Sequence, residues 1–369
     1  MLGSLTLPVD RPDPDFDEFQ QVLLGKKEAR KVHLVELGID PEIVSAILTE
    51  FLGEERLASP SEEPEAHWRQ RVRFWHEMGY DYIRVAGGIV FPRVKEKIAD
   101  DTAASSRGKR SWIDEHSGVI SSWADFDKYP WPEPDAFDFS SYEFVSKSLP
   151  QGMKMMVCPS SGVFEVTSEY LLGFEGMSYL LYEDPELVGA VFNKVGELIY
   201  DFYRNIVSLD NVGGFFQGDD LGFKTSTFLS PKHLQRFVLP WHRRYAELAH
   251  AHGQMYWLHA CGNLKNVMEF LIEDVKIDAL HSFQDEIMPV TEFKARYGHR
   301  VAALGGVDVD KLCRMGEEEL REYVRGILDQ CMPGRYALGS GNSVANYVPV
   351  KNYLIMLDEG VRWGRENVA

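Results

Sequence analysis

From residue 151 onward the sequence alternates short apolar runs with amphipathic ones, and this alternation constrains the fold more than any other feature. Apolar runs that predict strands lie at residues 152–162, 213–220, 254–263, 275–283, 299–308 and 335–342, with one more at 80–91. Patterns that predict helices lie at residues 171–182, 185–209, 230–252, 263–273, 291–297, 317–330 and 350–365. Short strands that alternate with helices indicate a parallel sheet covered by helices. We therefore predict an α/β fold of the (β/α)8 TIM-barrel type. The alternative is a doubly wound open sheet, although the chain lacks the Gly-x-Gly-x-x-Gly turn of a dinucleotide fold.

The N-terminal third follows a different pattern. Residues 1–68 are acidic and helical in pattern, which predicts a helical extension. Residues 94–147 combine a polar stretch with a proline- and aromatic-rich one and interrupt the alternation, so we predict an insertion there. The insertion is either a surface loop packed by its own aromatic residues or a lid over the barrel mouth. The lid is considered because long loops in compact domains often carry function. We expect one domain over residues 1–369.

Charge and cysteine content exclude several partners. A formal net charge of −18 argues against nucleic acid or an anionic membrane surface as the main partner. The four cysteines are irregularly spaced, and the N-terminus lacks the charged-then-apolar layout of a signal peptide. No apolar run approaches the roughly 18 residues of a membrane span. We expect a cytoplasmic protein with reduced thiols.

Polar side chains gather at the ends of the predicted strands and are scarce at the starts. In a barrel of this kind the active site lies at the carboxyl ends of the strands. The polar groups that follow the strands are Arg84, Ser160, Gln217, Asp219, Asp220, His259, Cys261, His281, Gln284, Asp308, Ser340 and Asn342. This asymmetry favours an enzyme or a small-molecule binder over a structural module.

His259 and Cys261 form a His-x-Cys pair where one strand ends. Side chains alternate faces along a strand, so two residues that are two apart point the same way. An imidazole beside a thiol is half of a zinc site or of a thiol-activating site. We assign both residues as metal ligands.

Asp219, Asp220 and Arg84 are the candidate catalytic residues. The two aspartates are either a helix cap plus a solvated carboxylate, or a pair whose repulsion raises one pKa. Arg84 can bind an anionic substrate, and Gly305 lets backbone approach a ligand. The candidate substrate-binding residues are Gln217, Gln284, Gly305, Asp308, Ser340 and Asn342. For His281 we favour a structural role, as a buried and hydrogen-bonded core histidine, over a role in the site.

Five segments together resemble the uroporphyrinogen decarboxylase superfamily of (β/α)8 barrels. The segments are GFEGMSYLLYEDPELV, FFQGDD with LSPKHLQRFVLPWHRR, LHACGN, ALGGVD and ALGSGNSVANYVPVKNYLIML. The resemblance covers residues 150–369 well and residues 65–95 more weakly. It implies either the haem-pathway decarboxylase or the methyltransferases that exchange methyl groups between corrinoid proteins and a thiol or folate acceptor.

The methyltransferase branch binds zinc with a His-x-Cys pair and a distant second cysteine, which resembles His259 and Cys261. The distant cysteine should fall near residues 340–342, where this chain has Ser340, Gly341 and Asn342. An oxygen ligand could complete the site, from Asp219, Asp220, Gln284 or Asp285.

The resemblance to the decarboxylase branch implies a reaction without a cofactor, in which arginines bind the substrate carboxylates and an aspartate faces the tetrapyrrole. This chain departs from that pattern of residues. The expected aspartate falls on Gly87, the expected tyrosine on Glu169 beside Tyr170, and the late histidine on Ser340. The sequence is thus a divergent member, nearer the methyltransferases.

Three functions follow from the resemblance. The first is a methyltransferase-like enzyme, zinc-dependent, that acts on a small molecule or a corrinoid protein. The second is a cofactor-free decarboxylase of an acidic tetrapyrrole-like substrate, with Asp219 or Asp220 as acid and Arg84 as clamp. The third is a non-catalytic corrinoid- or tetrapyrrole-binding protein. The family also suggests a homodimer.

Overall fold

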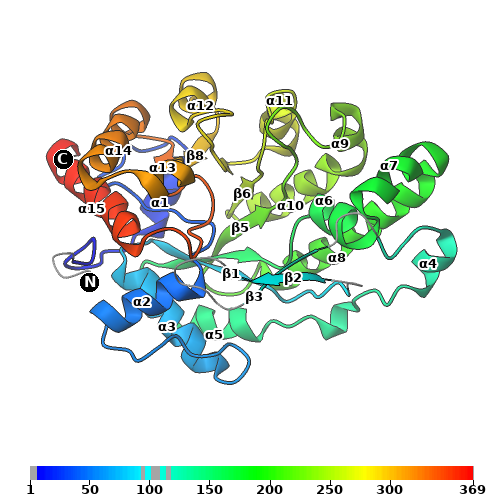
Figure 1. The fold of residues 1–369 in the computed structure, drawn as a ribbon, viewed down its shortest axis with the longest axis horizontal. Coiled ribbons are helices and arrows are strands. Elements are labelled where there is room, and N and C mark those ends of the chain that lie inside the picture. The colour runs from blue at the N-terminus through cyan, green and yellow to red at the C-terminus, as the bar shows by residue number, and fades with distance from the viewer. Residues whose placement is uncertain (1–5, 93–95, 101–108, 114–117, 369) are drawn as a thin grey trace.

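Seven parallel strands form one curled sheet in a computed structural model that describes residues 6–92, 96–100, 109–113 and 118–368 (Figure 1). In sheet order the strands are β1 (Tyr82–Ala86), β4 (Lys154–Cys158), β5 (Val212–Gly218), β6 (Met255–His259), β7 (Ala279–His281), β8 (Ala302–Leu304) and β9 (Tyr336–Ala337). Each strand falls within or beside its predicted run, so the α/β fold with a parallel sheet is confirmed.

Helices follow the strands as the alternation predicts. They are α6 (Val163–Glu165), α7 (Phe174–Glu183), α8 (Pro185–Ile206), α9 (Pro231–Phe237), α10 (Leu239–Ala251), α11 (Met268–Phe270), α12 (Val290–Tyr297), α13 (Val309–Arg314), α14 (Glu317–Cys331) and α15 (Val350–Asn367). Short π-helical segments extend α6 over Val166–Leu171 and α11 over Leu271–Val275. The helix predicted over residues 230–252 is split at Val238, since Pro240 has no N–H for a continuous helix. Asp184 and Ser230 cap α8 and α9 with their side chains, as the Asp-Pro and Ser-Pro pairs suggest.

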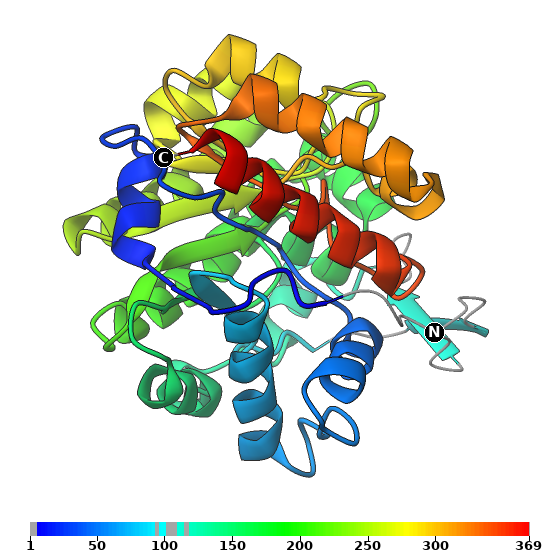
Figure 2. The ribbon, with the colours of Figure 1, turned by 90° about the vertical axis from the view of Figure 1, so that its left-hand side faces the viewer.

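The N-terminal extension contains three helices and one extended segment that the sequence pattern did not predict. The helices are α1 (Phe16–Leu23), α2 (Pro41–Phe51) and α3 (Pro64–Glu77). Between α1 and α2, Val35 N–H donates to Leu338 O (2.8 Å) and Leu338 N–H donates to His33 O (2.9 Å), a parallel pairing beside β9. Figure 2 shows this N-terminal part, in blue, beside α15, in red. The N-terminal extension and the C-terminal helix therefore lie side by side at one edge of the sheet.

The expected barrel has eight strands, whereas seven are found in this sheet within the described residues. Residues 33–36 occupy the gap between β9 and β1. They bond to β9 through backbone, but to β1 through a side chain: the Tyr82 hydroxyl donates to Glu36 O and accepts from Glu36 N–H. The parallel sheet is thus established, and complete eight-strand closure is not.

An aromatic cluster fills the interior at the amino ends of the strands. The Trp257 ring lies 5.3 Å from Tyr82, 5.6 Å from Phe19 and 6.2 Å from Phe16, centroid to centroid. Phe16 and Phe19 belong to α1, and a Cβ on Gly213 would come within 2.4 Å of the Phe16 ring. Because α1 closes this end, the carboxyl ends of the strands are left to form a site.

A buried ionic network joins α1 and residues 31–33 to the start of β1. His33 Nδ1 lies 2.6 Å from Asp81 Oδ2, its Nε2 lies 3.3 Å from Glu18 Oε2, and Lys31 Nζ lies 2.7 Å from Asp81 Oδ1. Burial raises the pKa of Asp81, but His33 and Lys31 outweigh it and bring that pKa to about 2. Burial lowers the pKa of His33, and Asp81 and Glu18 outweigh it, so the net shift is upward. His33 is therefore a charged imidazolium between two carboxylates.

The predicted insertion has structure of its own. It holds the antiparallel pair β2 (Glu96–Asp100) and β3 (Lys109–Ile113), then α4 (Trp123–Lys128), a 3₁₀ turn (Pro134–Ala136) and α5 (Ser140–Ser148). Its residues 94–95, 101–108 and 114–117 lie outside the described part of the chain, so the lid stays a prediction.

No described helix is both long and apolar enough to cross a membrane.

Candidate metal centre

Strand register brings Gly218 and the predicted positions His259 and His281 into one row at the carboxyl edge of the sheet. Gly218 of β5 pairs with His259 of β6, and His259 pairs with His281 of β7. Residues in register on parallel strands point to the same side, so the two imidazoles face each other. Gly218 has no side chain, and a Cβ there would lie 3.9 Å from both Arg84 Nη2 and His259 Cδ2. This glycine leaves room beside the His259 ring.

Asp220, His259 and Cys261 bring their ligand atoms within 4.8 Å of one another. His259 Nε2 lies 3.3 Å from Asp220 Oδ1 and 3.5 Å from Cys261 Sγ. Asp220 Oδ1 also accepts a hydrogen bond from Cys261 N–H (2.9 Å), which ties the ends of β5 and β6 together. The His-x-Cys pair thus meets one of the two adjacent aspartates. No other such group of three occurs in the part of the chain that the structure describes.

Hydrogen bonds determine the tautomers of the two histidines. His281 Nε2 lies 3.2 Å from Ser340 O, and a carbonyl can only accept, so His281 carries its proton on Nε2. Burial, then His259, lowers the pKa of His281 well below its ordinary value, so this ring is neutral. His281 Nδ1 must therefore accept from His259 Nδ1 (2.7 Å). His259 Nε2 is left facing an acceptor, Asp220 Oδ1, and either a proton or a metal cation has to lie between them.

Two polar side chains surround the Cys261 thiol. Asn342 Nδ2 lies 3.3 Å from the sulfur and Ser282 Oγ lies 3.4 Å away. The Asn342 amide is oriented by Ser343 N–H, which donates to its Oδ1 (2.8 Å). Ser282 has a φ of 111°, a conformation that a residue with a side chain adopts only under strain. Burial, then Asp220, raises the pKa of Cys261 to about 12.

Asp219 faces away from this cluster. Its carboxylate accepts from Phe164 N–H (3.1 Å), Glu165 N–H (2.9 Å) and His242 Nε2 (2.8 Å), and His242 Nδ1 accepts from the Tyr256 hydroxyl. Asp219 therefore anchors the start of α6. The two aspartates do not form a facing pair: Asp220 has a lowered pKa, because His259 outweighs the upward effect of burial. The raised pKa belongs to Glu165, through burial and then Asp219 and Asp220.

Arg84 lies inside the sheet near the cluster. Its guanidinium donates to Phe216 O (3.1 Å), Leu37 O (3.3 Å) and Cys158 Sγ (2.8 Å). Within the described residues no carboxylate lies at ion-pair distance from it. The positive charge is therefore available to an anionic group.

The predicted substrate-binding residues separate into two sets. Gln217 is buried, accepts from the Tyr203 hydroxyl and donates to Ser160 O and Gly218 O, so it joins β4 to β5. Ser340 is buried against Glu36. The other set lines a pocket of about 670 Å³ and consists of Gln284, Asp308 and Asn342. Because Asn342 also contacts Cys261, this pocket opens beside the thiol.

Gly305 serves the protein itself, since a Cβ there would lie 2.2 Å from Ser340 O and 3.1 Å from His281 Nε2, at a φ of +78°. Gly305→Ala is expected to separate His281 from Ser340 and to lower stability by about 1–3 kcal/mol, measured by urea unfolding. Gly326→Ala is the control, because it lies in α14 with nothing within 4 Å. Equal stabilities of the two variants would contradict this prediction.

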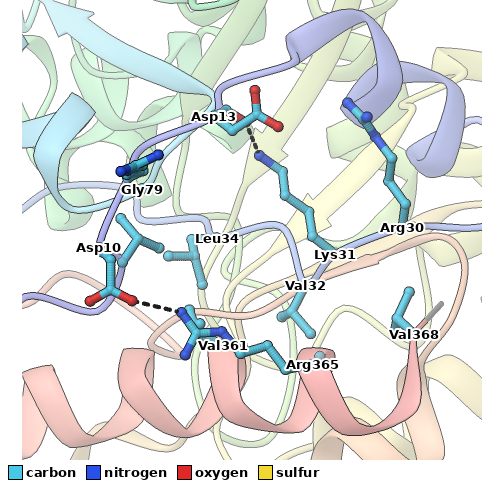
Figure 3. Close-up of a pocket in the computed structure, with 13 residues that line it drawn as sticks. Asp10, Asp13, Arg30, Lys31, Val32, Leu34, Gly79, Val361, Arg365 and Val368 are labelled. Carbon is cyan, nitrogen blue, oxygen red and sulfur yellow. Dashed lines mark hydrogen bonds and ion pairs between the residues drawn. The ribbon is translucent and has the colours of Figure 1, made fainter.

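A second pocket, of about 600 Å³, lies at the opposite end of the strands (Figure 3). Val32 and Leu34 are among the residues that line it. Two of its cations are paired: Arg365 pairs with Asp10, while Lys31 donates to Asp13 O and pairs with the buried Asp81. The one group of three metal-binding side chains found among the described residues lies outside this pocket.

Two residues near the site, Glu36 and Glu165, were missed by the sequence reasoning. Glu36 interrupts the apolar run VHLVELGI, a signal that could have marked it. Glu165 carries no such signal, because an acidic residue in a helix is common, whereas Ser282 could be expected from its position directly after a predicted strand.

Fold and cluster together define an α/β protein with a polar site at the carboxyl edge of a curled parallel sheet. Residues 119–362 match the model of the uroporphyrinogen decarboxylase (URO-D) family. The chain belongs to this family, as the resemblance of its motifs suggested. No protein with a curated description matches the sequence.

Solved structures with a related fold include a methyltransferase from Methanosarcina mazei. It has 12% identity and a TM-score of 0.66, over 94% of this chain and 98% of that one. A protein described as a vitamin-B12-independent methionine synthase from Listeria monocytogenes has 12% identity and a TM-score of 0.46, over 91% and 96% of the two chains. At such identity the first of these supports the fold alone.

Proposed function

We propose that this chain is a zinc-dependent, methyltransferase-like enzyme whose ion is held by Asp220, His259 and Cys261. The observation that carries the proposal is the convergence of three ligand atoms on one point at the carboxyl edge. In this proposal residues 1–369 form one domain. Residues 33–36 take the place of the eighth strand and complete the (β/α)8 barrel.

The donor set fits zinc in both chemistry and spacing. Nitrogen, thiolate and carboxylate oxygen are the ligands that Zn²⁺ uses. Tetrahedral Zn–N and Zn–O distances of about 2.0–2.1 Å and a Zn–S distance of about 2.3 Å separate the ligand atoms by about 3.3–3.6 Å. The distances of 3.3 Å between Nε2 and Oδ1 and 3.5 Å between Nε2 and Sγ agree with this. Three protein ligands leave one position open, as in catalytic zinc sites.

Each surrounding residue supports this site in a stated way. His281 Nδ1 accepts a hydrogen bond from His259 Nδ1–H, which leaves Nε2 of His259 as the ligand atom. Asn342 and Ser282 hold the Cys261 sulfur in place. Zinc, when bound, lowers the pKa of a thiol that binds to it, so that at neutral pH the thiolate can accept a methyl group. The pocket lined by Gln284, Asp308 and Asn342 would hold the body of a small acceptor.

A large methyl donor, such as a corrinoid carried by a partner protein, would approach over an aromatic rim. Phe223 and Phe228 are 45% and 42% exposed and follow β5, and Phe223 O accepts from Asn263 N–H, two residues after Cys261. Exposed aromatic clusters beside a pocket are typical of binding surfaces. The fold that this chain shares with the M. mazei methyltransferase is compatible with this proposal.

Decarboxylation of an acidic substrate is the second candidate. Arg84 favours it, because its guanidinium points toward the cluster without a carboxylate partner among the described residues. Asp220 rather than Asp219 would then be the candidate acid, because its carboxylate lies in the cluster. Release of CO₂ from an acidic tetrapyrrole by metal-free protein would establish this activity.

Metal analysis of the anaerobically purified protein tests the first candidate. We expect about one zinc per chain. Removal by a chelator should lower the free energy of unfolding by about 3 kcal/mol relative to protein in zinc at 100 times its Kd. Protein that stays below a tenth of an equivalent after zinc addition and dialysis would exclude this candidate and leave the second.

A further inference from the structure

Glu36 is a fully buried glutamate that holds the loop after β9. Its Oε1 accepts from Ser340 N–H (3.0 Å), and its Oε2 shares a hydrogen bond with Ser340 Oγ. Ser340 Oγ also contacts Asn342 O. One side chain from the N-terminal extension therefore reaches the loop that carries both Ser340 and Asn342.

The count of hydrogens places a proton on Glu36. The Asn342 carbonyl can only accept, and Ser340 Oγ has a single hydrogen. Both contacts of Oγ are satisfied when Glu36 donates to Oγ and Oγ donates to Asn342 O. An ionised Glu36 would compete with Asn342 O for the one hydrogen.

The surroundings of Glu36 favour the neutral acid. The groups that face it are the phenols of Tyr80 and Tyr82 before and on β1, Tyr336 on β9 and Tyr353 on α15. Arg84 reaches Leu37 O but not the Glu36 carboxyl. No cation of the described chain lies at ion-pair distance from Glu36, and burial raises its pKa to about 8.

We propose that Glu36 is a positioning residue of the metal centre. Its carboxylic acid proton fixes Ser340 Oγ and the loop of residues 339–343. That loop presents Ser340 O to His281, which sets the tautomers of His281 and His259, and it places Asn342 against Cys261. The inference rests on the proposed metal centre for its purpose, while the tautomers themselves are a property of the metal-free chain.

Nitrogen-15 NMR of histidine-labelled, metal-free protein tests the proposal directly. His259 and His281 are assigned by the loss of their signals in His259→Gln and His281→Gln. At pH 6.5 we expect His281 protonated on Nε2 in wild type and in Glu36→Gln, whose amide still donates to Ser340 Oγ. At pH 9 wild type should lose this pattern and Glu36→Gln should keep it. Glu36→Met should lack the pattern at both pH values. The matched control is Glu359→Gln, because Glu359 is also a buried glutamate and pairs with Arg321 and Arg325. This variant should show the same pH dependence of the histidine signals as wild type.

Zinc affinity at pH 6.5, measured by competition with a chromogenic chelator, gives the second readout. Glu36→Met should bind about 10–100-fold more weakly than wild type, the usual cost of losing an outer-shell partner, and Glu359→Gln should match wild type. If Glu36→Met keeps the tautomers and the affinity of wild type, or if Glu36→Gln titrates as wild type does, the proposal is overturned. If wild type binds no zinc, the proposed function fails, and the tautomer pattern still decides the role of Glu36.

Discussion

Cys261→Ser is expected to weaken zinc binding by more than about 100-fold, beyond the range seen when only an outer-shell partner is lost. The reason is that a serine hydroxyl stays protonated where a thiolate would bind the ion, and the remaining imidazole and carboxylate form only two ligands. His259→Gln should have an effect of the same order, since it removes the nitrogen that lies 3.3 Å from Asp220 Oδ1 and 3.5 Å from Cys261 Sγ.

Isothermal titration with ZnCl₂ measures this effect, with folding monitored by circular dichroism. Cys313→Ser is the matched control, because Cys313 is a half-buried thiol on α13 outside the cluster. Its affinity should equal that of wild type. Tight, stoichiometric zinc binding by Cys261→Ser would show that the ion lies elsewhere and would remove the basis of the proposed centre.

Asp81→Asn is expected to lower the free energy of unfolding by about 3–5 kcal/mol near pH 5.5. Removing one partner of a buried ion pair leaves the other charge uncompensated, and here His33 and Lys31 both lose their carboxylate. The network also anchors α1, whose Phe16 and Phe19 close the amino end of the sheet. Loss of Asp81 therefore weakens packing as well as charge pairing.

The effect of Asp81→Asn should depend on pH in two directions. The pKa of Asp81 is lowered to about 2 from 3.8, so its contribution is present above about pH 4 and is lost as the pH falls toward 2. The pKa of His33 is raised above 6.5, so its contribution is present below pH 6.5 and is lost as the pH rises through the folded value. The difference between wild type and variant is thus largest between about pH 4.5 and 6.5.

Urea unfolding across this pH range checks the prediction. Asp17→Asn provides the control, because Asp17 is a largely exposed carboxylate on the same helix and, among the described residues, forms an ion pair only with Lys154. Its unfolding midpoint should follow that of wild type at every pH. A flat difference between Asp81→Asn and wild type from pH 4 to pH 9 would contradict the charged network.

The sequence predicted the strand positions and the edge that carries the site, because burial imposes a repeating apolar pattern and a parallel sheet places its strand ends together. His259 and Cys261 were predicted to share a face, and their side chains do contact each other. The pattern could not distinguish Asp219 from Asp220: the direction of each carboxylate depends on where α6 packs, and only Asp219 meets backbone N–H groups there.

Residues 33–36 were missed for a related reason. A stretch this short holds too few positions to reveal a strand period, and its pairing partner lies about three hundred residues away in the chain. Glu36 could be recognised as special only once that pairing placed it against Ser340.

The pairing of Leu34 with Leu338 also constrains how the chain can be made. On the ribosome, residues 33–36 emerge about three hundred residues ahead of Leu338 and remain without their neighbour until that later segment has been synthesised. Contacts of such long sequence separation form slowly, because closing the intervening loop costs entropy before any pairing repays it. We therefore expect this sheet edge and the loop that carries Ser340 and Asn342 to assemble later than the contacts between neighbouring strands. A nascent chain that stops before β9 would expose an open edge to chaperones and aggregation, and the proposed metal centre would mature only after the loop that follows β9 has emerged.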